Sequence, residues 1–271
     1  MKKISYTILV AGLIGFISAC STSDKKEESK LKDMPSANEF AKKEFKYPIP
    51  TSFQVTALLQ DADASFVLGI TNPIENVDKY ETRKSKALNL GVYGADLSYA
   101  STYNQQDETM KLLSVSKTLL EGLELSTVFN ADMAKSIEAN IDNKDSLITI
   151  VTQSFYDTYS ELNNSDQSKL SLLVVCGSWI EALYITSQLA VSSNYDPRLM
   201  EVVAKQKLSA QKLAELCEVY GENDEDIKSV LPLLRFMNIV YEGVIDGSGI
   251  TEGQLGDILE NVTLTRNRIV N

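Results

Sequence analysis

An apolar stretch over residues 87–101 constrains the fold of this chain most, because it carries two glycines with no obvious turn partners. Read as a helix at steps of three and four residues, it has one face of small residues only: Ala87, Gly91, Gly94, Ser98 and Ser101. Small residues let a neighbouring helix approach closely. The flanking rows are apolar too, so we expect this helix to lie at the centre of the protein.

A second apolar stretch, residues 168–191, is long enough to suggest a membrane span. Glu181, Gln188 and several hydroxyl residues interrupt it, which favours a buried central helix instead. Gly177 and Ser178 would give the first stretch a small surface to pack against. We therefore predict two central helices in contact.

The rest of the chain also shows helical spacing and no strand of comparable strength. We predict an all-α fold, a single domain over residues 47–271 with eight to ten helices around the two central apolar helices. The 44% hydrophobic content is enough for a sizeable core. The expected helices run over about 52–70, 73–104, 106–122, 126–140, 145–162, 168–191, 197–220, 225–244 and 251–269.

Some helix ends can be predicted from single residues. Gly122 is expected to end its helix as a left-handed cap, and Asp196 to cap a helix that begins at Pro197. Pro232 either kinks its helix or marks a restart capped by Ser229.

The first 20 residues have the three-part layout of a secretory signal peptide: Lys2 and Lys3, an apolar run and a small-residue step. Within them, Ile17-Ser18-Ala19-Cys20 resembles the lipobox of bacterial lipoproteins. The resemblance implies cleavage before Cys20, a diacylglycerol group on its sulfur and a fatty acyl chain such as palmitate on its new amino group. An ordinary signal peptide with a chance cysteine and a transmembrane helix are the alternatives, but the apolar run is shorter than the ~20 residues that a span needs.

The chain then divides into a signal peptide (1–19), a lipidated cysteine with a flexible tether (20–46) and the helical domain. Ser21 stands where an aspartate retains enterobacterial lipoproteins in the inner membrane, so the resemblance implies the outer membrane, facing the periplasm or the surface. Lys26-Glu27-Glu28 resembles a surface-export signal, although we favour a solvated linker there. The mature domain resembles uncharacterised helical envelope lipoproteins of Gram-negative bacteria and no characterised family.

Charge and composition exclude several classes of function. Without Lys2 and Lys3, 24 basic residues face 37 acidic ones, a net charge of −13, so nucleic acid is a poor partner and membrane contact is expected only through Cys20. The absence of histidine excludes Ser-His and Cys-His catalysis and His-ligated metals. Residues 246–255 resemble an EF-hand loop only superficially, because Ile245 and Gly247 occupy positions that need oxygen ligands. We predict no cofactor and no metal site.

Two carboxylates remain as candidate catalytic residues, Asp96 and Glu181, one in each central helix. Face to face, they could be the acid and base of a glycan-cleaving site. The interpretation we favour is structural: Asp96 would be partly buried and would need a donor such as a tyrosine hydroxyl, Arg or Lys, and Glu181 would be a satisfied structural acid. Cys176 and Cys217 fit the core as free thiols, with a disulfide as the alternative.

The sequence therefore favours a lipid-anchored envelope lipoprotein that acts as a non-enzymatic binding or scaffolding module of unknown ligand. The alternative is a carboxylate-dependent hydrolase of envelope glycans that uses Asp96 and Glu181. A solvent-open pocket holding both acids would favour the hydrolase, whereas burial with hydrogen bonds and no cleft would favour the module.

Overall fold

The structure is a computed structural model that describes residues 59, 64–125, 131–164, 168–245 and 249–271. The predicted signal peptide, Cys20 and the predicted tether lie outside the described residues. So does most of the helix expected over residues 52–70. That helix does not extend to Ile70 as predicted, because the backbone is non-helical from Ala64 to Ile70.

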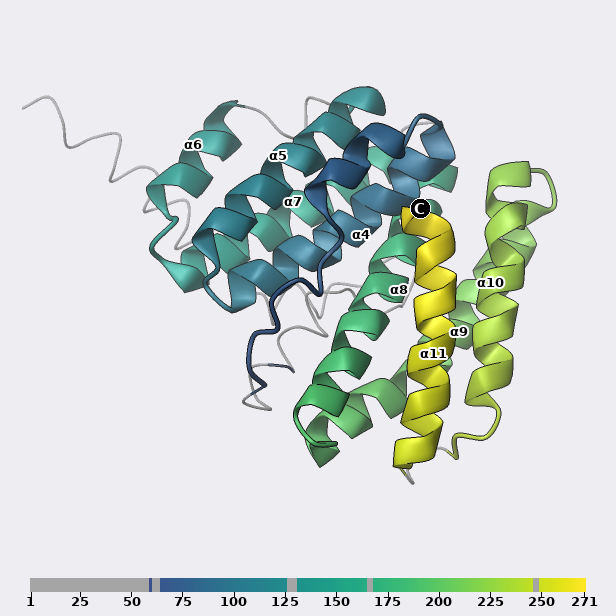
Figure 1. Ribbon diagram of the computed structural model, residues 1–271. Coiled ribbons are helices and arrows are strands. Elements are labelled where there is room, and N and C mark those ends of the chain that lie inside the picture. The colour runs from purple at the N-terminus through teal and green to yellow at the C-terminus, as the bar shows by residue number, and fades with distance from the viewer. Residues whose placement is uncertain (1–58, 60–63, 126–130, 165–167, 246–248) are drawn as a thin grey trace, which may run out of the picture. The chain divides into compact units, whose positions relative to one another are not determined.

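Helices are the only regular secondary structure among the described residues, which confirms the all-α prediction (Figure 1). They share a core made mainly of Leu, Ile, Val, Ala and Tyr side chains. In chain order they are η1 (Ile74–Lys79), α4 (Arg83–Thr102), α5 (Gln106–Gly122), α6 (Ala131–Ala139), α7 (Lys144–Asn164), α8 (Ser168–Ser192), α9 (Pro197–Gly221), α10 (Glu225–Tyr241) and α11 (Glu252–Val270).

Helix α4 lies at the centre, as its apolar faces predict. Every residue from Ala87 to Thr102 except Gly94 is buried. The helix begins at a capping box, in which the Thr82 hydroxyl accepts from Ser85 N at 3.0 Å and Thr82 N donates to Ser85 Oγ at 3.0 Å. These bonds satisfy backbone donors that the first turn would otherwise leave unpaired.

Helices α4 and α8 pack backbone against backbone at one glycine from each. A Cβ atom on Gly91 would overlap the Val174 carbonyl oxygen, and one on Gly177 would overlap the Leu88 carbonyl oxygen. The predicted close approach of the two central helices is therefore confirmed. The prediction that Gly94 also packs against α8 is wrong, because its open side faces the Phe155 ring of α7.

The apolar helix α8 is the one element in the described parts of the chain with the length and hydropathy of a membrane span. Within its most apolar window, 89% of the residues are buried inside the protein. Helices α9, α10 and α11 run alongside it (Figure 1). This burial agrees with the predicted central core helix.

Several expected helix ends are confirmed and others are wrong. Asp196 caps α9, accepting from Arg198 N at 2.9 Å, and Pro197 occupies the first position. The helix expected over 73–104 is instead split into η1 and α4, because the chain turns at the residues before the α4 cap. The left-handed residue after α5 is Glu124 (φ 65°), not Gly122.

Helix α10 resolves the alternatives for Pro232. Asp224 caps the helix, since its carboxylate accepts from Ile227 N at 3.0 Å. Pro232 lies inside the continuous helix Glu225–Tyr241. A restart capped by Ser229 is therefore wrong.

Candidate functional site

The two candidate acids meet in the core. Asp96 lies in α4 and Glu181 in α8, each little more than one turn after the glycine at which the two helices touch. Both side chains are fully buried, with 0% of their surface exposed. The sequence predicted partial burial for Asp96, and the structure buries it completely because α4 is covered on nearly all sides.

A third residue, Arg266 of α11, completes the cluster. Its Nε donates to Glu181 Oε2 at 2.6 Å and its Nη2 donates to Glu181 Oε1 at 2.8 Å. The guanidinium also lies 4.5 Å from the centre of the Tyr184 ring. A two-pronged bond of this kind fixes both side chains and satisfies both carboxylate oxygens.

Arg266 is the residue that sequence reasoning missed. Its signal was available in α11, where the buried positions Leu255, Ile258, Val262 and Ile269 form one helical stripe. Arg266 falls on this stripe, four residues after Val262. A lone arginine among buried aliphatic residues indicates a buried acidic partner.

The carboxyl group of Asp96 is bound from two sides. Its Oδ2 accepts from the backbone N–H of Asn72 at 3.0 Å, a donor that the sequence did not predict. Its Oδ1 is buried without an N–H or hydroxyl donor, and the Glu181 carboxylate lies near enough for the two acids to share a hydrogen bond when one of them is protonated. Two carboxylates can share a hydrogen bond only if one of them carries the proton.

The surroundings assign this proton to Asp96. Burial raises its pKa well above that of an exposed aspartate, and the negative charge of Glu181 raises it further, whereas Arg266 and the Asn72 N–H lower it in part. Glu181 already accepts two bonds from a cation, so it holds the negative charge. Asp96 is then a neutral donor to Glu181, and the cluster has no net charge.

A chain of polar contacts connects this cluster to the segment before α4. The Asn72 amide donates to the Tyr80 hydroxyl at 2.9 Å, and that hydroxyl donates to the Val270 carbonyl at 3.1 Å. Asn89 donates to the Ile269 carbonyl at 2.9 Å. These bonds satisfy carbonyls at the end of α11, which have no partner within their own helix.

The geometry leaves no space for a substrate between the acids. Retaining glycosidases hold their two carboxyl groups about 5–5.5 Å apart, and inverting enzymes hold them farther apart. Here the two groups are bonded directly to each other. The arrangement can hold three helices together and keep one proton in the core.

The surface pockets lie elsewhere. One of about 520 Å³ lies between α9 and the residues Val244, Ile245 and Gly249, and one of about 370 Å³ lies between α9 and α10. A narrow apolar crevice of about 40 Å³ lies among α4, α5, α7 and α8. Asp96, Glu181 and Arg266 line none of these three. Among the described residues, no group of three or more Cys, Asp or Glu side chains is placed to hold a metal ion.

The two remaining cysteines lie in the core as free thiols. Cys176 of α8 and Cys217 of α9 are both fully buried, and their sulfur atoms are 3.7 Å apart. The hydrogen bond with Cys217 and burial raise the pKa of the Cys176 thiol. The sequence predicted the apolar setting of each thiol but not that the two touch.

Comparison of the chain with protein-family models, with curated proteins and with solved structures gives no match.

Proposed function

We propose that this protein is a lipid-anchored cell-envelope lipoprotein whose helical domain acts as a non-enzymatic binding or scaffolding module. The observation that carries the proposal is the state of its two candidate acids. Asp96 and Glu181 are fully buried and bonded to each other, and Glu181 is also bonded to Arg266. Acidic residues buried and bonded in this way stabilise the packing of the helices and are not accessible to a substrate.

The envelope location is supported by the amino-terminal sequence. The lipobox-like Ile17-Ser18-Ala19-Cys20 implies a lipid anchor, and the polar segment after it suits a tether. The serine after Cys20 favours the outer membrane. The membrane is then a partner through the lipid alone, since a chain that has a net charge of −13 without Lys2 and Lys3 has little attraction for anionic headgroups.

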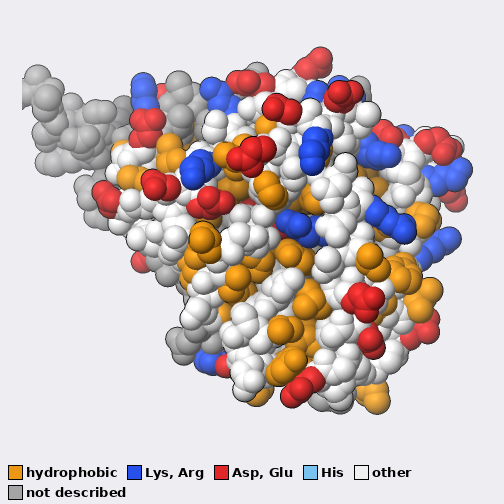
Figure 2. Space-filling view, in the orientation of Figure 1, with side chains coloured by type: hydrophobic (Ala, Val, Ile, Leu, Met, Phe, Trp, Pro, Cys, Tyr) orange, Lys and Arg blue, Asp and Glu red, His pale blue; other side chains and the backbone are white. Residues whose placement is uncertain are grey.

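The surface offers a site for the binding role at the pocket between α9 and the residues Val244, Ile245 and Gly249. Leu208, 63% exposed, and Ile245, 72% exposed, contribute apolar surface there. Lys205 is paired with Glu201 at 2.6 Å, and Lys207 donates to the Val244 carbonyl, so the charges of the lining are largely matched. Such a lining suits a partner with exposed apolar groups. Figure 2 shows further hydrophobic side chains at the surface of one face, mainly in its lower half.

The alternative is a carboxylate-dependent hydrolase of envelope glycans. One observation favours it: Asp96, whose pKa is raised, has the protonation state of a general acid. Its carboxyl group would have to separate from Glu181 and reach solvent before it could protonate a glycan. Hydrolysis of purified peptidoglycan by the wild type, lost in a folded Asp96→Asn variant, would establish this alternative.

The anchor is tested by replacing Cys20 with serine in the full chain expressed in a Gram-negative host. We expect the wild type to incorporate a labelled fatty acid and sediment with membranes. The Cys20→Ser variant should lose the label and either become soluble or accumulate as uncleaved precursor. Membrane attachment of the wild type without any acyl label would contradict lipidation.

A further inference from the structure

Cys176 and Cys217 are far apart in the chain and adjacent in the fold. They are 41 residues apart in sequence, and their sulfur atoms lie 3.7 Å apart across the contact between α8 and α9. A disulfide needs the sulfurs at about 2.05 Å, so they must approach by about 1.6 Å. We propose that these two cysteines form an intramolecular disulfide in an oxidising thiol–disulfide environment, joining α8 covalently to α9.

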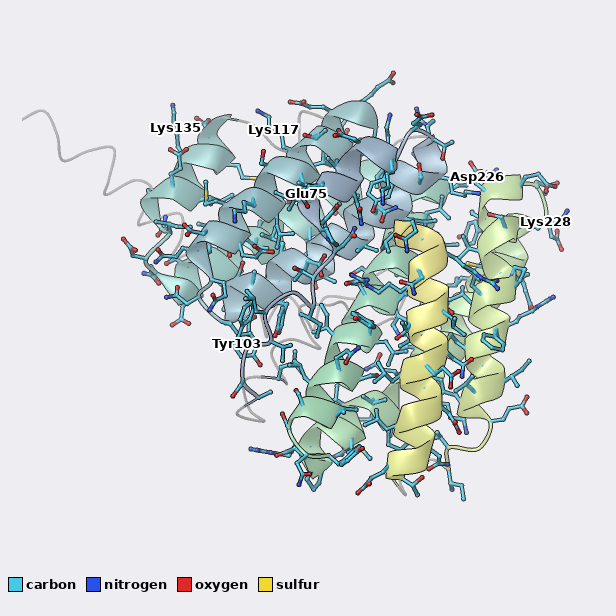
Figure 3. All side chains as sticks on the ribbon, in the orientation of Figure 1. Glu75, Tyr103, Lys117, Lys135, Asp226 and Lys228 are labelled. Carbon is cyan, nitrogen blue, oxygen red and sulfur yellow. The ribbon has the colours of Figure 1, made fainter. Side chains whose placement is uncertain are left out.

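The cysteine pair lies beneath a surface pocket. Cys217 contributes to the lining of the open pocket of about 370 Å³ between α9 and α10. Gly221 and Leu231 line the same pocket, as does Lys228, whose side chain points outward from the first turns of α10 (Figure 3). Cys176 lies behind Cys217, on α8. Both thiols are fully buried, so a reagent from solvent reaches Cys217 only when the contact between α9 and α10 opens locally.

The reaction is an exchange with an oxidant of the disulfide class, such as oxidised glutathione or a thiol–disulfide oxidoreductase. The Cys217 thiol loses its proton, and its thiolate attacks one sulfur of the oxidant, which expels the other sulfur as a thiolate. Cys176 then loses its proton and attacks the Cys217 sulfur, which expels the second thiolate. Two protein thiols are oxidised and one disulfide is reduced to two thiols, with two protons released from the protein.

The bond would fasten a peripheral helix to a central one. Helix α9 packs on α8 and also carries α10. Closing a loop of this length restricts the unfolded chain more than the folded one, so the oxidised protein should melt at a higher temperature. Whether the disulfide forms in the cell rests on the proposed export of the protein to the envelope. Its formation in solution does not depend on that proposal.

The test uses the full chain with Cys20→Ser, so that Cys176 and Cys217 are the only thiols. The folded protein is equilibrated with oxidised glutathione, denatured, and treated with a maleimide carrying a polyethylene glycol chain. We expect loss of both maleimide additions, retention of monomer mobility without reductant, and a mass lower by two hydrogen atoms. The reductant dithiothreitol should restore both additions.

Variants Cys176→Ala and Cys217→Ala serve as matched controls: each keeps one thiol, which can exchange with glutathione but cannot form an intramolecular bond, so neither should lose two hydrogen atoms. Two reactive thiols after equilibration with oxidised glutathione would overturn the proposal. A disulfide-linked dimer or a mixed disulfide with glutathione as the end product would also overturn it. Because the tested chain lacks Cys20, the result is independent of whether the lipid anchor exists.

Discussion

Replacing Asp96 with asparagine removes a titrating group from the core and keeps its shape. The asparagine amide can donate to Glu181 where the protonated Asp96 donates now. Its carbonyl oxygen can accept from Asn72 N, as Asp96 Oδ2 does at 3.0 Å. The variant should therefore fold like the wild type while no longer needing a bound proton.

The effect of pH follows from the direction of the pKa shift. The pKa of Asp96 is raised by burial and by Glu181, so above pH ~4 the folded wild type holds a proton that the unfolded chain releases. The contribution of Asp96 to stability is thus fully present below the unfolded pKa and is lost as pH rises toward the folded pKa. Each pH unit in that window costs the wild type about 1.4 kcal/mol, and two units cost about 2.7 kcal/mol.

The assay is urea unfolding of both proteins at pH 5, 6 and 7. The other titrating groups are the same in both proteins, so the difference between their unfolding free energies isolates Asp96. We expect that difference to shift in favour of Asp96→Asn as pH rises, by about 1.4 kcal/mol per pH unit at most and only while the pH lies below the folded pKa. Asp257→Asn, a change at an exposed position of α11, is the matched control and should show no such slope. A flat difference for Asp96→Asn would refute the neutral, proton-sharing aspartate.

Three other substitutions test the packing, the ion pair and the cap, each by urea unfolding. Gly91→Ala should destabilise the protein by about 2 kcal/mol or more, because the added methyl group overlaps the α8 backbone. Gly94→Ala meets only the edge of the Phe155 ring at 3.5 Å, so its stability should stay within about 1 kcal/mol of the wild type. Similar losses for both variants would contradict the described packing. Arg266→Leu should cost about 3–5 kcal/mol of stability because it leaves the buried Glu181 carboxylate unpaired. Arg268→Leu, at an exposed position of α11, is the control and should be nearly neutral. A small loss for Arg266→Leu would mean that the ion pair is dispensable. Thr82→Ala should cost about 1 kcal/mol through loss of the α4 capping box, and no loss would show that the cap contributes little.

The close packing of α4 and α8 was predictable because small residues at helical spacing have a direct steric meaning. Gly91 and Gly177 touch the facing backbone as that spacing requires. Gly94 was assigned to the wrong neighbour because a step of three residues turns about 60° away from the starting direction. The sequence pattern cannot show which of two adjacent helices covers each edge of such a face.

The meeting of Asp96 with Glu181 could be suggested from the sequence but required the structure to establish. Each acid was recognisable as an exception in an apolar helix, but their contact depends on how the helices cross. Arg266 could have been found from the α11 stripe. The Asn72 N–H could not, because a backbone donor in an irregular segment has no sequence signal and its position depends on the tertiary path of the chain.

Some helix ends were predictable because a single side chain decides them. Asp196 and Asp224 cap α9 and α10 through their own carboxylates. The break before α4 was missed because Ser85 stands where the usual capping box has Glu or Gln. The lipid anchor at Cys20 stays a prediction from the sequence.

The central proposal, that Asp96 and Glu181 are structural and do not hydrolyse glycans, is tested most directly by measuring release of soluble glycan from purified peptidoglycan. The wild type and Asp96→Asn are compared at equal concentration, after circular dichroism has shown that both are folded. The account predicts no release above buffer for either protein. Release by the wild type that is abolished in folded Asp96→Asn would contradict it.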